Sequence, residues 1–184
     1  MQEIIKDAEQ KMKGAIEHAR EEFGAIRTGR AHPAMFNKLT VDYYGSPTPL
    51  QQLATFQVPE ARTVLISPFD RNAMAGIEKT IRDSDLGVNP SNDGHVIRIV
   101  MPQLTQERRR EYVKMSRSKA EEAKVAVRNI RRHANDSVHK LLKDKEVGED
   151  DARQAEKQLD GITKRYVDQV DELLKAKEAE LLEV

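Results

Sequence analysis

The stretch from Thr105 to about Lys143 most constrains the fold, because small and apolar residues recur in it at alternating steps of three and four. This is the period of one buried face of an α-helix. Thr105 is a suitable N-cap residue and follows closely after Pro102. We therefore predict one long helix here, whose inward face comprises Val113, Ser116, Ala120, Ala123, Val127, Ile130, Ala134 and Leu141.

A second stripe on the same predicted helix is basic. Its members follow one another at steps of 4, 3, 7, 4 and 3, which keeps them within roughly a third of the circumference. Because the apolar face packs against partner helices, we expect the basic stripe at the surface, as a track for an extended polyanion. It comprises Arg110, Lys114, Arg117, Lys124, Arg128 and Arg131.

The alternative interpretation of this stripe is an ordinary solvated helix face. Arginine outnumbers lysine four to two in it, and arginine matches phosphate oxygens bidentately. Like-charged neighbours such as Arg110 and Lys114 destabilise an isolated helix by roughly 0.2–0.5 kcal/mol per pair, which a purely structural helix has no reason to keep. The main counter-argument is neutralisation by acidic residues of another helix.

Two further segments show helical period. The first runs from about residue 3 to Thr28, where Gly29 is the expected stop. The second begins after Gly148, with Glu149, Asp150 and Asp151 at the positive end of the helix dipole. Their inward faces comprise Ile5, Ala8, Met12, Ile16, Ala19, Phe23 and Ile26 in the first, and Ala152, Ala155, Leu159, Ile162, Tyr166, Val170, Leu173 and Leu181 in the second.

Residues 30–104 differ in character and contain all seven prolines. Strand-like patterns occur at Thr40–Tyr44, Arg62–Ser67 and His95–Met101, with a short amphipathic helix at Asn72–Ser84. The sequence therefore predicts an α+β chain, in which a small α/β domain is inserted into a three-helix bundle. Two short crossings join the parts, an arrangement typical of a hinge.

The charge is balanced overall, with 31 Lys/Arg and 31 Asp/Glu, but segregated along the chain. Residues 105–132 hold ten basic and four acidic residues, and residues 144–184 hold seven and thirteen. Cysteine is absent, which excludes disulfides and thiolate chemistry. No apolar run reaches the roughly 20 residues of a membrane span, and no catalytic motif occurs. We expect neither an enzyme nor a cofactor or metal site.

Five motifs strongly resemble the bacterial ribosome recycling factor family: IRTGRAHP (26–33), VDYYGSPTPLQQLA (41–54), SDLGVNPSNDG (84–94), PQLTQERRREYVK (102–114) and EEAKVAVRNIRRHAND (121–136). The resemblance extends over essentially the whole chain. It implies an elongated, L-shaped molecule, with a bundle of residues 1–29 and 105–184 and an inserted β/α/β domain of residues 30–104. It also implies a cytoplasmic, non-catalytic factor that binds the post-termination ribosome. With elongation factor G and GTP, such a factor promotes subunit splitting and release from mRNA.

The resemblance also implies which residues act. The bundle would contact RNA of the large ribosomal subunit, and elongation factor G would push the small domain and hinge. We expect a monomer without a membrane or small-molecule partner. Among the implied RNA-binding residues, Arg27, Arg128 and Arg131 match the main RNA-contacting arginines of the family. The others are Arg110, Arg117, Lys124 and Arg132. The two short crossings place the hinge at Gly29, Arg30, Ala31, Pro102, Gln103, Leu104 and Thr105.

Two other interpretations remain open from the sequence. A helical adaptor that assembles as a coiled coil would form salt-tolerant oligomers through the apolar stripe. A general RNA-binding module would bind any structured RNA with comparable affinity.

Overall fold

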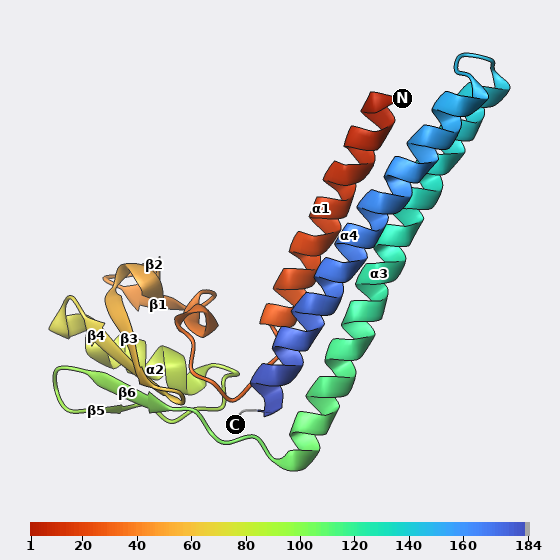
Figure 1. The fold of residues 1–184 in the computed structure, drawn as a ribbon. Helices are drawn as coiled ribbons and strands as arrows, with labels where there is room; N and C mark the ends of the chain where they lie inside the picture. The colour runs from red at the N-terminus through yellow and green to blue at the C-terminus, as the bar shows by residue number, and fades with distance from the viewer. Residues whose placement is uncertain (183–184) are drawn as a thin grey trace. The chain divides into compact units, whose positions relative to one another are not determined.

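The computed structural model describes residues 1–182, which form two compact units. Within the described residues, one unit contains Met1–Thr28 and residues 105–182, and the other is Gly29–Leu104. Within residues 1–182 the first unit is a bundle of α1 (Gln2–Gly24), α3 (Gln106–Lys143) and α4 (Glu149–Leu182) (Figure 1). The second unit combines β-sheet with the short helix α2 (Met74–Asp83). The predicted α+β class, a helical bundle with an inserted domain, is confirmed.

The long basic helix has the bounds that its sequence predicts. The hydroxyl of Thr105 accepts a hydrogen bond from the Arg108 N–H at 3.1 Å, which caps the N-terminus of α3. Four of the predicted inward residues, Val113, Ala123, Ile130 and Leu141, are only half-buried, and Val138 is buried in addition. The fully buried residues of α3 are Ser116, Ala120, Val127, Ala134 and Val138.

Helix α1 ends earlier than predicted. Its last helical residue is Gly24, and the N–H of Ala25 closes the final turn by donating to the Glu21 carbonyl at 3.1 Å. Ile26 continues the apolar period and is buried in the bundle core, although it lies in a turn outside the helix. Because Ile26 continues the apolar period, the predicted helix extended past its true end. Gly29, with φ of 78°, belongs to the first crossing to the inserted unit.

The bundle core runs along all three helices. One cluster packs Met12, Ile16 and Phe23 of α1 against the other two helices, and includes Val127, Tyr166 and Val170. A second cluster lies towards the start of α1 and includes Ile5, Ala8, Ala134, Val138 and Leu159. In this arrangement α1 runs antiparallel to α3 and parallel to α4 (Figure 1).

The inserted unit contains β1 (Thr40–Tyr43) paired antiparallel with β2 (Ser46–Pro49). A larger antiparallel sheet has the order β3-β4-β6-β5. Its strands are β3 (Ala54–Glu60), β4 (Thr63–Pro68), β5 (Ser91–Asn92) and β6 (Ile97–Val100). The sequence patterns located β1, β4, β6 and α2. Strands β2 and β3 went unpredicted because their prolines, Pro47, Pro49 and Pro59, argue against strand structure. The core of this unit includes Phe36, Leu50, Ile66, Ile77, Ile81, Ile97 and Ile99.

Both crossings to the bundle are fastened to one turn of the inserted unit. The N–H of Ala31 donates to the Ala61 carbonyl, and the N–H of Met101 donates to the adjacent Arg62 carbonyl, each at 2.7 Å. Ala31 and Met101 are also buried in the core of the insert. The backbone between these anchors and the bundle is therefore short, comprising residues 27–30 on one side and 102–104 on the other.

Candidate nucleic-acid interface

The basic stripe of α3 divides into two sets, because α4 packs along one side of it. Three cations, which we call the seam cations, pair with acidic residues of α4. Arg117 Nε lies 2.8 Å from Glu178 Oε1, and Arg131 Nη1 lies 3.7 Å from Asp160 Oδ1. Between them, Lys124 pairs with Asp171. The seam cations are spaced seven residues apart, or about two turns, so all three point to the same neighbour.

All three seam cations are partly neutralised, but only Lys124 and Arg131 are also partly withdrawn from solvent, whereas the Arg117 side chain is 67% exposed. The Lys124 side chain is 15% exposed and lies 3.8 Å from Glu121 in addition to its α4 partner. The Arg131 side chain is 39% exposed. A phosphate that approached these groups would compete with carboxylates already in place. The expected neutralisation by the acidic helix therefore occurs at three predicted RNA-binding residues, Arg117, Lys124 and Arg131.

The other three stripe residues, Arg110, Lys114 and Arg128, face solvent, as does Arg132 at the edge of the stripe. We call Arg110, Lys114, Arg128 and Arg132 the outer cations. All four are exposed, and none pairs with a carboxylate within residues 1–182. They form two i,i+4 pairs whose starting residues are 18 positions apart, about 27 Å along the helix. Glu121 lies on the same side between them, so the exposed basic surface is two patches and not one continuous track.

The other predicted residues lie outside the long helix. Arg27 is half-buried, two residues before Gly29 in the first crossing, and it interacts with other parts of the chain. The ion pair between Lys119 and Glu22, at 3.5 Å, brings the end of α1 beside the first third of α3. Arg27 therefore lies at the same end of the bundle as Arg110 and Lys114. The predicted hinge residues lie in the crossings, except that Ala31 is anchored in the insert and Thr105 caps α3.

Sequence reasoning missed the α4 partners that separate the two sets. A usable signal exists, since Asp160, Asp171 and Glu178 follow one another at 11 and 7 residues, which are close to whole numbers of turns. Such a row on α4 can face the seam cations of an antiparallel helix. Lys114 belongs to the basic stripe but not to the residues implied by the family resemblance, and like its neighbour Arg110 it is exposed.

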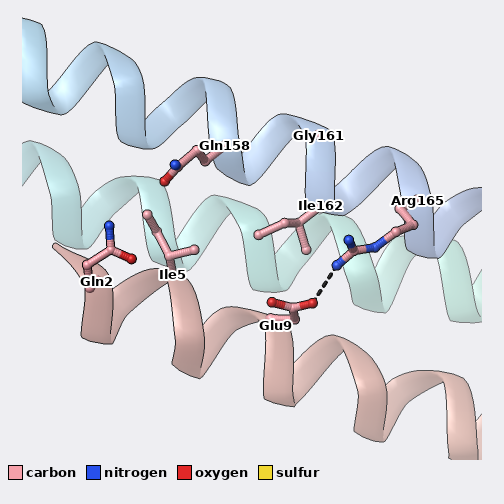
Figure 2. Close-up of a pocket in the computed structure, with 7 residues that line it drawn as sticks. All are labelled: Gln2, Ile5, Glu9, Gln158, Gly161, Ile162 and Arg165. Atoms are coloured by element: carbon pink, nitrogen blue, oxygen red, sulfur yellow. Dashed lines mark hydrogen bonds and ion pairs between the residues drawn. The ribbon is translucent and has the colours of Figure 1, made fainter.

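A shallow pocket of about 370 Å³ lies between α1 and α4, but its chemistry does not suit a polyanion (Figure 2). Its walls include Gln2, Ile5, Gln158 and Gly161, and an ion pair between Glu9 and Arg165 crosses it. The charges are thus matched within the pocket. The same Glu9 carboxylate lies 3.4 Å from the Tyr166 hydroxyl, so the group connects α1 to α4.

Among residues 1–182, no three His, Cys, Asp or Glu side chains are grouped to hold a metal ion. Every helix in that part of the chain is too short or too polar to span a lipid bilayer. The outer cations therefore remain the best candidate site.

Comparison with known proteins gives one consistent family. A family model described as ribosome recycling factor matches residues 19–182. The chain is 67% identical over 184 residues to a ribosome-recycling factor of Cutibacterium acnes, and 61% identical over 184 residues to one of Streptomyces coelicolor, covering 100% of both chains in each case.

Solved structures agree. A solution structure of a ribosome recycling factor has a TM-score of 0.80 and 41% identity, covering 100% of this chain and 97% of that one. Another is described as models for the T. thermophilus ribosome recycling factor and the E. coli elongation factor G bound to the E. coli post-termination complex. It has a TM-score of 0.68 and 42% identity, and covers 98% of each chain.

Proposed function

The chain belongs to the ribosome recycling factor family, and we propose that its bundle binds RNA of the large ribosomal subunit while elongation factor G acts on its inserted domain. Its function is ribosome recycling. Subunit splitting, with elongation factor G and GTP, releases the ribosome from mRNA so that it can reinitiate. The related structure, described as models for a ribosome recycling factor and elongation factor G bound to a post-termination complex, supports the ribosome and elongation factor G as partners. Family membership sets aside the coiled-coil adaptor and the general RNA-binding module.

The observation that carries the RNA-binding proposal is the exposure of the outer cations without carboxylate partners within residues 1–182. Unpaired guanidinium and ammonium groups lose little when they exchange water for phosphate, and counterions released from the RNA add free energy. The seam cations begin paired, so a phosphate gains less from them. We therefore assign the main contacts to Arg110, Lys114, Arg128 and Arg132, and secondary ones to Arg27, Arg117, Lys124 and Arg131.

The hinge proposal rests on the two crossings. Gly29 has a left-handed backbone, and the anchors at Ala31 and Met101 place both crossings at the same turn of the insert. Rotation about the backbone of residues 27–30 and 102–104 can then move the insert while α3 remains bound to RNA. We propose that the chain acts by binding and movement alone, as a cytoplasmic monomer without a cofactor, and that elongation factor G supplies the GTP hydrolysis.

Co-sedimentation with purified large ribosomal subunits across a salt series tests the RNA-binding surface. Replacing Arg128→Gln together with Arg132→Gln removes one outer pair. We expect at least ~tenfold weaker binding and a salt slope reduced by about two, one for each lost phosphate contact. The matched control is Arg153→Gln with Lys157→Gln, an exposed i,i+4 basic pair on α4. Equal losses in both double variants would contradict the assignment, because only overall charge would then matter.

A further inference from the structure

The outer face of α3 changes character between its two pairs of outer cations. Arg110 and Lys114 form the first pair, and Arg128 and Arg132 form the second. The segment between them, residues 115–127, holds three cations, and all three pair with carboxylates of the neighbouring helices. The pairs are Arg117 with Glu178, Lys119 with Glu22, and Lys124 with Asp171. A polyanion on this face therefore meets unpaired cations at both ends and only paired ones between them.

An acidic and an apolar side chain occupy the middle of the outer face. Lys114, Glu121, Val125 and Arg132 follow one another at steps of 7, 4 and 7 residues, each close to a whole number of turns. The Glu121 side chain is 67% exposed and lies 3.8 Å from Lys124, which already pairs with Asp171. Val125 is 49% exposed. Both side chains are therefore available to whatever the outer cations bind.

Glu121 makes this face unfavourable for a continuous phosphate chain. The two pairs of outer cations lie about 27 Å apart along the helix. Phosphates of one nucleic-acid strand follow one another at a much closer spacing. A strand that runs along α3 must then place phosphates within about 10 Å of the Glu121 carboxylate, a distance at which salt does not fully screen repulsion.

Glu121 and Val125 suit the other surfaces of RNA, its sugars and base edges. A carboxylate accepts hydrogen bonds from a ribose 2′-hydroxyl or from the amino group of cytosine. An exposed valine gains free energy when an apolar ribose or base surface covers it. Folded RNA presents such surfaces between its phosphate backbones, in loops and in the wide, shallow minor groove. The order along α3, cations, then Glu121 and Val125, then cations, matches such an RNA.

We propose that Glu121 and Val125 determine the specificity of the α3 face: it binds folded RNA in which sugars and base edges separate two phosphate segments, and it disfavours a continuous phosphate chain. This inference rests on the proposed function, because it describes the RNA that the outer cations bind. Specificity is a difference between two affinities, and a repulsive group increases it as a new contact does.

Two binding measurements on the full-length protein test the role of Glu121. The probes are purified large ribosomal subunits and long-chain inorganic polyphosphate, which has phosphates but neither sugars nor bases. Glu121→Lys should bind polyphosphate at least ~tenfold more tightly than the wild type, because it replaces repulsion by attraction in the middle of the face. The ratio of subunit affinity to polyphosphate affinity should therefore fall. Glu121→Gln, which adds no cation, should lower the ratio by less.

The matched control is Glu172→Lys, which makes the same change of charge at an exposed position of α4. It should leave the ratio of the two affinities unchanged. Circular dichroism checks that each variant keeps its helix content. An unchanged ratio in both Glu121 variants, or an equal change in Glu172→Lys, would overturn the proposal.

The apolar contact has a test of its own. Val125→Ser should bind large subunits at least ~threefold more weakly. Its salt slope should be that of the wild type, because an apolar contact releases no counterions. The control is Met115→Ser, since Met115 is 46% exposed on the same helix but ten residues from Val125, which places it to one side of the outer face. Equal losses in both variants, or a reduced salt slope, would contradict the role of Val125.

The outcomes separate this inference from the proposed function. Co-sedimentation of the Arg128→Gln/Arg132→Gln variant at the wild-type level would contradict the RNA contact of the outer cations, and with it this inference. Where that variant binds weakly, the ratio measured for Glu121→Lys decides the specificity proposal alone.

Discussion

At the scale of single residues, hydrogen-bonded neighbours decide what a charged or polar group can do. Arg131 and Arg132 are adjacent in sequence, yet one faces Asp160 and the other faces solvent. Likewise Tyr43 and Tyr44 are adjacent, but the Tyr43 hydroxyl donates a hydrogen bond to Asp70 whereas Tyr44 is exposed. The hydrogen bond to Asp70, followed by burial, raises the pKa of Tyr43 to about 12, and the same hydrogen bond holds the pKa of Asp70 below its ordinary value.

These pKa shifts predict a pH-dependent stability at the β1–β2 hairpin. The folded pKa of Tyr43 exceeds its unfolded value of 10.0, so its contribution is complete below pH 10 and is lost between pH 10 and about 12. The lowered pKa of Asp70 means that its contribution is lost in acid, as the pH falls below 3.8. We expect the Tm difference between wild type and Tyr43→Phe to be constant from pH 6 to about 9 and to shrink at pH 11. A difference unchanged at pH 11 would contradict this.

At the scale of elements, the contact between α3 and α4 determines which cations are available. The seam cations stabilise the antiparallel pairing of two long helices, whereas the outer cations contribute little to folding. Lys124 is the most enclosed of the seam cations, with Glu121 and Asp171 as acidic neighbours. The basic helix thus carries two adjoining stripes, one that pairs with α4 and one that faces solvent and is proposed to bind RNA.

Charge reversal should separate the two stripes. We expect Lys124→Glu to lower the free energy of unfolding by about 1–2 kcal/mol, because it places a carboxylate against Asp171 in a partly desolvated seam. Arg128→Glu should change it by less than about 0.5 kcal/mol. Urea unfolding followed by circular dichroism measures both. Adding Asp171→Lys to Lys124→Glu should restore most of the lost free energy of unfolding. A further decrease in the double variant would contradict the pairing of Lys124 with Asp171 across the seam.

At the scale of the whole molecule, each unit has its own core and the chain crosses between them twice. Both crossings are hydrogen-bonded to the turn after β3, which restricts where the connecting backbone can move. The proposed RNA contacts lie on the bundle, and the domain on which elongation factor G is proposed to act is the insert. A force on the insert can then be opposed by binding of the bundle.

The connection at Gly29 provides a test of this arrangement. Proline cannot adopt the φ of 78° found there, so Gly29→Pro must change the path of the first crossing. We expect an altered small-angle scattering profile with unchanged helix content by circular dichroism. Gly14→Ala, at an uncrowded position within α1, should leave the profile unchanged. Identical profiles for wild type and Gly29→Pro would contradict the hinge.

The sequence by itself determined the helices, the α+β class and the family. Helix period depends on local spacing, and the family motifs are contiguous, so both are visible without the fold. Only the tertiary structure decided that α1 ends at Gly24, that β2 and β3 form strands despite their prolines, and how the basic stripe divides. Periodicity shows which residues share a helix face, but not how a neighbouring helix is rotated against it. The position of Asp160, Asp171 and Glu178 therefore settled which cations of the stripe have a carboxylate partner on α4.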